Sequence, residues 1–133
     1  MKKTAFFLLL SLPLLFACNT NEKLKLGTYY GQIPCADCPG INVQLELKED
    51  QTYLVKNFYL GENDVFEEQG SFKIQADSIL VLEKTDDENQ LYLIEKNELT
   101  MLDSKGKKSD SKLADFYKLK MEKPEGFTLS PKE

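Results

Sequence analysis

Short segments in which apolar and polar residues alternate follow one another along most of the chain. Residues 41–48 (INVQLELK) alternate without a fault, which is the two-residue period of a β-strand with one buried face and one solvated face. The polar residues 49–51 predict a turn into residues 52–59, a segment rich in aromatic and β-branched side chains, so the two segments predict a hairpin. Glycine at position 70 predicts a bulge or bend within one further strand. The further strands are expected at residues 28–33, 65–74, 78–84, 90–96, 98–103 and 116–119.

These strands, about eight in all and with almost no helical pattern between them, predict an all-β fold. Sequential antiparallel strands joined by short turns bury their edges best by closing into an up-and-down barrel, so we expect a small antiparallel, lipocalin-like barrel. A barrel of this size is either filled by side chains or holds one small ligand, and the pattern leaves both open. Seven aromatic residues are expected as core or as the lining of a cavity: Tyr29, Tyr53, Phe58, Phe66, Phe72, Tyr92 and Phe116.

The N-terminus carries a short basic segment, an apolar stretch and a cysteine. Two lysines precede residues 4–16, which suit a secretory signal but are fewer than the roughly 20 apolar residues that span a bilayer. The stretch ends in Leu15-Phe16-Ala17-Cys18, which resembles the lipobox at which bacterial lipoproteins are cleaved and acylated. We therefore expect a signal peptide at residues 1–17 and a lipid, such as palmitate, on Cys18. An ordinary secreted protein and a short membrane anchor are the alternatives.

The rest of the chain has no composition break that would divide it. Residues 18–25 are expected to form the lipidated N-terminus and a polar linker, and residues 26–120 one barrel domain. Residues 121–133 contain two prolines and little periodicity, which predicts a C-terminal tail that is loose or lies along an edge.

Composition excludes several classes of function. Without residues 1–17 the chain has 15 lysines against 22 acidic residues, a net charge of −7 that argues against binding nucleic acid. All of its basic residues are lysine, so the bidentate guanidinium groups that grip phosphates are missing. The chain has no histidine, which removes the usual general base and the commonest metal ligand. We therefore expect a protein that is not an enzyme.

One motif carries distinctive chemistry, Cys35-Ala36-Asp37-Cys38, between two predicted strands. It could form a local disulfide in the oxidising envelope, although so small a ring contributes only about 2 kcal/mol. It could be the redox pair of a thiol oxidoreductase, but that chemistry places CxxC at a helix N-terminus, and here a strand follows. Reduced Cys35 and Cys38 could also bind a soft ion such as Cu(I), whereas a closed zinc site would need further ligands such as Asp37.

The residues around this motif resemble a known family. Residues 30–41 (YGQIPCADCPGI), continued by Leu45, Leu47, Asp50, Tyr53 and residues 59–61, resemble the NlpE family of copper-resistance lipoproteins. The resemblance covers the N-terminal domain of that family, roughly residues 26–120. It implies an outer-membrane lipoprotein with a lipocalin-like barrel, linked to copper tolerance and to the signalling of surface adhesion or envelope stress to a sensor kinase.

The resemblance sets the functional expectation and its limits. We expect a non-enzymatic envelope lipoprotein that is anchored to the membrane by its lipid, meets an envelope sensor protein, and uses Cys35 and Cys38 as a redox or copper motif. The best-known family member carries a second domain with its own cysteines, and this chain ends after the predicted barrel, so roles of that domain are not carried over. Asn19 is not the aspartate that retains lipoproteins at the inner membrane of enteric bacteria, which favours the outer membrane. The alternative function is a lipocalin-like carrier of a small apolar ligand.

Overall fold

The computed structural model describes residues 23–85 and 88–130. The predicted signal peptide and the predicted lipid site, Cys18, lie outside the described residues. Within the described part, no helix is long and apolar enough to cross a membrane.

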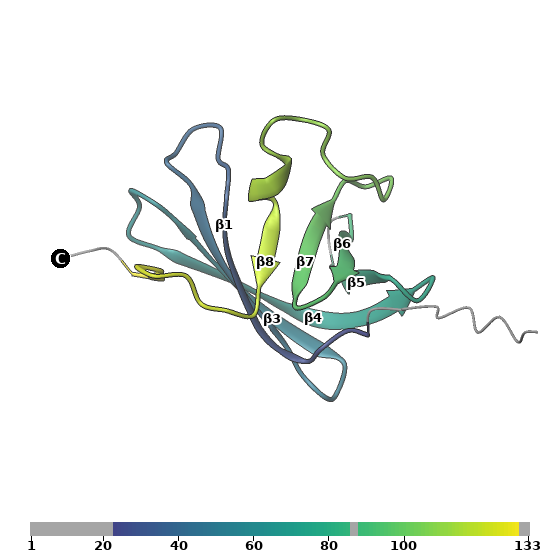
Figure 1. The fold of residues 1–133 in the computed structure, drawn as a ribbon. Helices are drawn as coiled ribbons and strands as arrows, with labels where there is room; N and C mark the ends of the chain where they lie inside the picture. The colour runs from purple at the N-terminus through teal and green to yellow at the C-terminus, as the bar shows by residue number, and fades with distance from the viewer. Residues whose placement is uncertain (1–22, 86–87, 131–133) are drawn as a thin grey trace, which may run out of the picture.

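The described residues form one closed barrel of eight antiparallel strands, in which each strand pairs with the next and β8 returns to β1 (Figure 1). A single 3-10 turn, η1 (Ala114–Phe116), precedes the last of them in this part of the chain. The all-β, up-and-down barrel predicted from the alternating pattern is therefore confirmed. The strands are β1 (Gly27–Ile33), β2 (Ile41–Leu47), β3 (Thr52–Tyr59), β4 (Val65–Gln75), β5 (Ile79–Glu83), β6 (Gln90–Glu95), β7 (Glu98–Leu102) and β8 (Lys118–Lys120).

The core occupies one end of the barrel. Alternate residues of β2 (Val43, Leu45 and Leu47) point inward and are at most 2% exposed, as the period of two requires. Inward-facing residues from the other seven strands join them in one apolar cluster. Each fully buried Leu-sized side chain in such a cluster contributes roughly 1.5–3 kcal/mol to stability. This packed end closes the bottom of the barrel and leaves the opposite end, the mouth, to be shaped by the loops.

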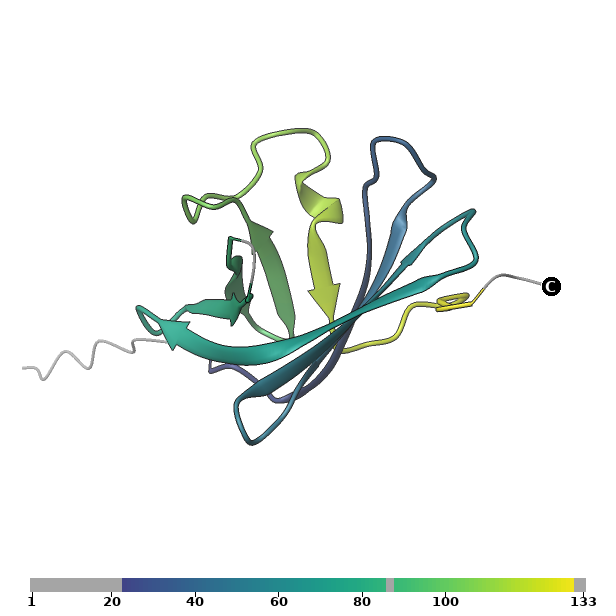
Figure 2. The same ribbon diagram turned by 180° about the vertical axis from the view of Figure 1, so that it is seen from behind.

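Strand β4 has no bulge at Gly70. Strand β4 pairs with β3 through Val65–Ser71 and with β5 through Ser71–Gln75, and neither register slips by a residue. A Cβ atom at Gly70 would lie 2.7 Å from the carbonyl oxygen of Glu83 and 2.9 Å from the ring of Tyr53. The glycine therefore serves a close approach, and the long strand curves around the barrel (Figure 2).

The last strand closes the barrel through a narrow seam. Strand β8 pairs with β7 at three positions and with β1 at one, Tyr30 opposite Lys120. The approach is tight, because a Cβ atom at Gly31 would lie 2.5 Å from the carbonyl oxygen of Lys118 and 2.6 Å from the Leu119 side chain.

Residues 122–130, here termed the C-terminal strap, run back over the outer face of the first strands (Figure 1). The ring of Phe127 meets Tyr30 edge to face at 5.3 Å, and the Asn42 amide donates to the carbonyl oxygen of Thr128 at 2.8 Å. Beneath the strap, Asn42 and Phe58 are only 6% and 2% exposed although both point away from the barrel interior. The strap therefore packs against the outer face of β1 and β2.

Three of the seven aromatic residues expected inside the barrel are not part of its core. Phe58 is buried under the strap instead. Phe66 is 52% exposed, since β4 extends beyond the barrel at that point, and Phe116 is 58% exposed. Successive backbone bonds from Ala114 to Ser111 and from Phe116 to Leu113 hold Phe116 in the 3-10 turn, so the last strand begins two residues later than predicted.

Candidate functional site

The two cysteines of the CxxC motif form a disulfide in the loop between β1 and β2. Their Cα atoms are 5.2 Å apart, within the usual range for a disulfide, and both residues are half-buried. The loop is tied to the β3–β4 turn, because the backbone N–H of Leu60 donates to the carbonyl oxygen of Gly40 at 2.9 Å. Ile33 and Ile41, on either side of the loop, line the mouth of the barrel. The disulfide loop is therefore part of the rim of the mouth.

The surroundings of Cys35 and Cys38 bear on the chemistry open to them. The chain passes from Cys38 into β2, so the motif lacks the helix N-terminus that lowers a thiol pKa in oxidoreductases. Among the described residues no three or more Cys, His, Asp or Glu side chains come together as a ligand set, so a closed zinc site with Asp37 is not formed there. Two thiolates suit Cu(I), and this pair would supply them only after reduction of the disulfide.

The mouth opens into a cavity inside the barrel, here termed the mouth cavity, with a volume of about 300 Å³. Its floor is formed by the buried side chains of Val43, Val55, Leu82 and Tyr92, which belong to the apolar core cluster and form its upper surface. The barrel interior is thus neither wholly filled nor wholly hollow. This volume is at the lower end of the range of small-molecule sites, about 300–1,000 Å³.

A small polar cluster reaches this cavity from β3, β4 and the end of β5. The Tyr53 hydroxyl donates to Glu68 Oε1 at 2.9 Å, and Lys84 Nζ lies 3.6 Å from Glu68 Oε2. Burial, followed by the hydrogen bond to Glu68, raises the pKa of Tyr53. Burial, followed by the charge of Glu68, raises the pKa of Tyr92. Both phenols therefore stay neutral hydrogen-bonding groups at physiological pH.

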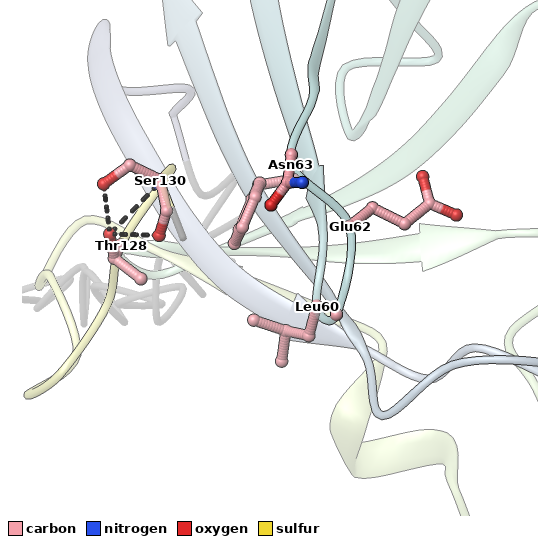
Figure 3. A pocket seen from close by; sticks show the side chains of 7 residues that line it. Leu60, Glu62, Asn63, Thr128 and Ser130 are labelled. Carbon is pink, nitrogen blue, oxygen red and sulfur yellow. Dashed lines mark hydrogen bonds between the residues drawn. The ribbon is translucent and has the colours of Figure 1, made fainter. Parts of the chain in front are cut away.

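A second hollow, of about 310 Å³, lies on the outside, between the β3–β4 turn and the C-terminal strap (Figure 3). Leu60 and Asn63 line it from the turn, and Thr128 and Ser130 line it from the strap. The Thr128 hydroxyl donates to the carbonyl oxygen of Ser130 and also forms a hydrogen bond with the Ser130 hydroxyl. The Glu62 carboxylate points away from Thr128 and Ser130 in Figure 3. Because its polar groups are turned to each other or to solvent, this hollow offers less to a ligand than the mouth cavity does.

Sequence reasoning found the cysteine pair but missed the polar cluster in the mouth. Glu68 is at an inward position of β4, two residues from Gly70 and four from the buried Phe72. A charged residue on the inward face of a strand would have indicated a polar site inside the barrel. Residues 65–69 (VFEEQ) do not alternate regularly, so the sequence does not show which face of this strand points inward.

Comparison with known proteins identifies relatives of this barrel. The family model described as the NlpE N-terminal domain matches residues 29–112. The curated Lipoprotein NlpE of Escherichia coli (strain K12) is 36% identical over 87 residues, which cover 63% of this chain and 36% of the relative. This chain therefore spans little more than a third of the length of that protein.

Two crystal structures are similar in fold and sequence. A presumed lipoprotein from Shewanella oneidensis superposes with a TM-score of 0.66 at 34% identity, over 75% of this chain and 91% of the other. The Cpx pathway activator NlpE from Escherichia coli superposes with a TM-score of 0.59 at 32% identity, over 67% of this chain and 47% of the other. Fold and sequence thus point to one and the same group of proteins.

Proposed function

Since this chain belongs to the NlpE family, we propose that it is a non-enzymatic lipoprotein of the cell envelope, whose disulfide loop reports redox or copper state to an envelope sensor protein. The family match confirms the resemblance first drawn from the PCADCPGI string. The observation that carries the proposal is the Cys35–Cys38 disulfide in the rim of the barrel mouth. A four-residue ring adds little stability, so its place in an accessible loop suits a reporting role better than a structural one.

The proposed anchor is a lipid on Cys18. Burying acyl chains contributes about 0.8 kcal/mol per methylene, so two or more chains hold a protein stably at a membrane. Asn19 and the family favour the outer membrane for this anchor. The polar residues that follow it would let the barrel stand away from the lipid and meet a partner.

The chemistry of the loop follows from its two states. A dithiol reductant supplies two electrons and two protons, the Cys35–Cys38 sulfur bond breaks, and two thiols form while the reductant becomes a disulfide. The released pair can bind Cu(I) through two thiolates, with loss of both protons. The bond from Leu60 to Gly40 couples the loop to the β3–β4 turn, so a change in the loop alters the surface that the rim presents.

A sensor protein of the membrane is the proposed partner. The Escherichia coli relative is described as an activator of the Cpx pathway, and this chain matches 47% of the length of that structure. The proposal for this chain is narrower, in that the barrel rim meets a protein partner of the envelope. The absence of histidine and arginine from the sequence supports a non-enzymatic role.

The test compares the parent chain with a Cys35→Ser, Cys38→Ser double variant, and uses Asp37→Asn as a loop variant that keeps both thiols. Thiol counting should find no free thiol from the pair before reduction and two after it. Cu(I) titration against a competing chelator should show one ion bound by the reduced parent and by Asp37→Asn, and none by the double variant. When each chain is expressed in cells that lack the parent, the parent and Asp37→Asn should restore copper tolerance and the double variant should not. If the double variant bound copper and supported tolerance as well as the parent does, the motif would have only a structural role.

A further inference from the structure

The mouth cavity has two chemically different walls. Ile33, Ile41 and Met101, from β1, β2 and β7, make one wall apolar. Asn57, Glu68, Lys84 and Gln90, which come from β3, β4, the position after β5, and β6, make the facing wall polar. A cavity with a divided lining suits a ligand that is itself divided into an apolar body and a polar group.

One buried hydroxyl in this cavity has no protein partner within residues 23–85 and 88–130. The buried tyrosines Tyr29 and Tyr53 donate to the Lys25 carbonyl oxygen at 2.7 Å and to Glu68 at 2.9 Å. Tyr92 is only 2% exposed, and its hydroxyl makes no such bond. In the described part, every buried polar side-chain atom that solvent cannot reach has a hydrogen-bond partner. The unpartnered Tyr92 hydroxyl must therefore be reachable by solvent, and the cavity that Tyr92 lines gives it that access. Buried tyrosine hydroxyls usually find a partner, and here a ligand can supply one.

The charges of the polar wall select the ligand's polar group. Lys84 Nζ and the Glu68 carboxylate lie 3.6 Å apart, so a charged group placed between them would face one charge of its own sign. An uncharged hydroxyl avoids this conflict, since it can donate to Glu68 and accept from Lys84 or Tyr92.

An aromatic lip continues the cavity toward solvent. Phe66 occupies the inward face of β4 two residues before Glu68, and its ring meets that of Tyr59 edge to face at 5.6 Å. Tyr59 itself lines the cavity. The half-exposed Phe66 ring would thus cover the end of a ligand that extends out of the mouth.

We propose that the mouth cavity binds a small uncharged amphiphile, with its hydroxyl or carbonyl group at Tyr92, Glu68 and Lys84 and its hydrocarbon body against Ile33, Ile41 and Met101. This differs from the small apolar ligand of the alternative function, because such a molecule would leave the Tyr92 hydroxyl without a partner. The inference does not depend on the redox role of the cysteines.

The test uses three probes with the same eight-carbon chain, namely 1-octanol, octanoate and octylammonium. Each is titrated into the full chain carrying Cys18→Ser, which removes the acylation site, while the amide resonances of Leu82 and Tyr92 are followed by NMR. Octanol should shift both resonances and bind at least about fivefold more tightly than either ion. Tyr92→Phe should weaken octanol binding about fivefold, the value of one hydrogen bond. Tyr117→Phe, outside the cavity lining, is the matched control and should change nothing.

Two charge variants make the proposal falsifiable even if Tyr92→Phe fails to fold. Glu68→Gln should shift the preference toward octanoate, and Lys84→Gln should shift it toward octylammonium. The proposal is overturned if octanol leaves the Leu82 and Tyr92 resonances unmoved, if the three probes bind the parent equally, or if both charge variants keep the parent's order of affinities.

Discussion

The ring of Tyr53 lies over Gly70, its partner across β3 and β4, and its hydroxyl reaches past that glycine to bond Glu68 at 2.9 Å. Strand β4 passes from its pairing with β3 to its pairing with β5 at Ser71, directly after this glycine. The missing side chain at Gly70 leaves room for the tyrosine ring and for the Glu83 carbonyl oxygen, so the polar cluster of the mouth depends on this glycine.

Gly70→Ala should destabilise the fold by roughly 1–3 kcal/mol, because the new methyl group meets the Glu83 carbonyl oxygen and the Tyr53 ring at less than 3 Å. Urea denaturation monitored by circular dichroism measures the loss. Gln69→Ala, the exposed neighbour, is the control. A midpoint for Gly70→Ala equal to that of the control would show that the backbone relaxes and that the close approach is not required.

Ending the chain after Met121 removes the C-terminal strap and should destabilise the barrel by about 2 kcal/mol. The reason is that Phe58 becomes exposed and the buried Asn42 amide loses its acceptor at Thr128. The free energy of unfolding in urea provides the measurement. A chain ended after Ser130 keeps these contacts and should match the parent, whereas equal stability of all three chains would mean that the strap is not part of the folded unit.

Glu95→Gln should destabilise the protein near neutral pH but not in acid. A hydrogen bond from Thr100, followed by the interactions with Lys108, lowers the pKa of the Glu95 carboxyl in the folded state. A lowered pKa gives stability that is present above the unfolded value of about 4.3 and is lost as pH falls through the folded value. The gap in melting temperature between parent and variant should therefore be widest at about pH 7 and should narrow progressively as the pH falls below about 4.3.

The exposed loop variant Glu62→Gln is the control for that experiment, and its melting temperature should stay close to that of the parent throughout. A gap for Glu95→Gln that does not narrow at all as the pH falls below the unfolded value of about 4.3 would assign the effect to packing.

Reduction of the Cys35–Cys38 disulfide should lower stability by about 2 kcal/mol and leave the barrel folded, because the loop lies outside the apolar core cluster. Denaturation with and without a dithiol reductant measures this difference, and the Cys35→Ser, Cys38→Ser variant should behave as the reduced parent does in both solutions. Global unfolding on reduction would instead make the disulfide a structural requirement of the fold.

The barrel was predictable wherever one face of a strand meets the core and the other meets water. Strands β2 and β3 alternate in this way and were placed to within one residue. The burial of Phe58 and Asn42 on the outer face could not be predicted, because it depends on the C-terminal strap. In the Asn42–Thr128 contact, the two residues are 86 positions apart in the sequence. A segment of low periodicity gives no local signal of where it docks.

The candidate site was predictable to the same extent. Cys35 and Cys38 are neighbours in sequence, so a local motif was enough to pair them. Glu68 and Lys84 come from different strands, and only the register of β3, β4 and β5 brings them to one wall. Phe116 was misplaced because a 3-10 turn of three residues leaves no periodic pattern to recognise.

The seam between β1 and β8 sets the order in which this chain can complete its fold. Until residues 118–120 are available, the edges of β1 and β7 have no partner and Leu119 is missing from the core. Contacts between the two ends of a domain form late, since the whole intervening chain must be closed into a loop first. For a protein exported as we propose, the nascent chain would therefore stay open and translocation-competent until almost all of it had been made, and the barrel would seal only on the far side of the membrane.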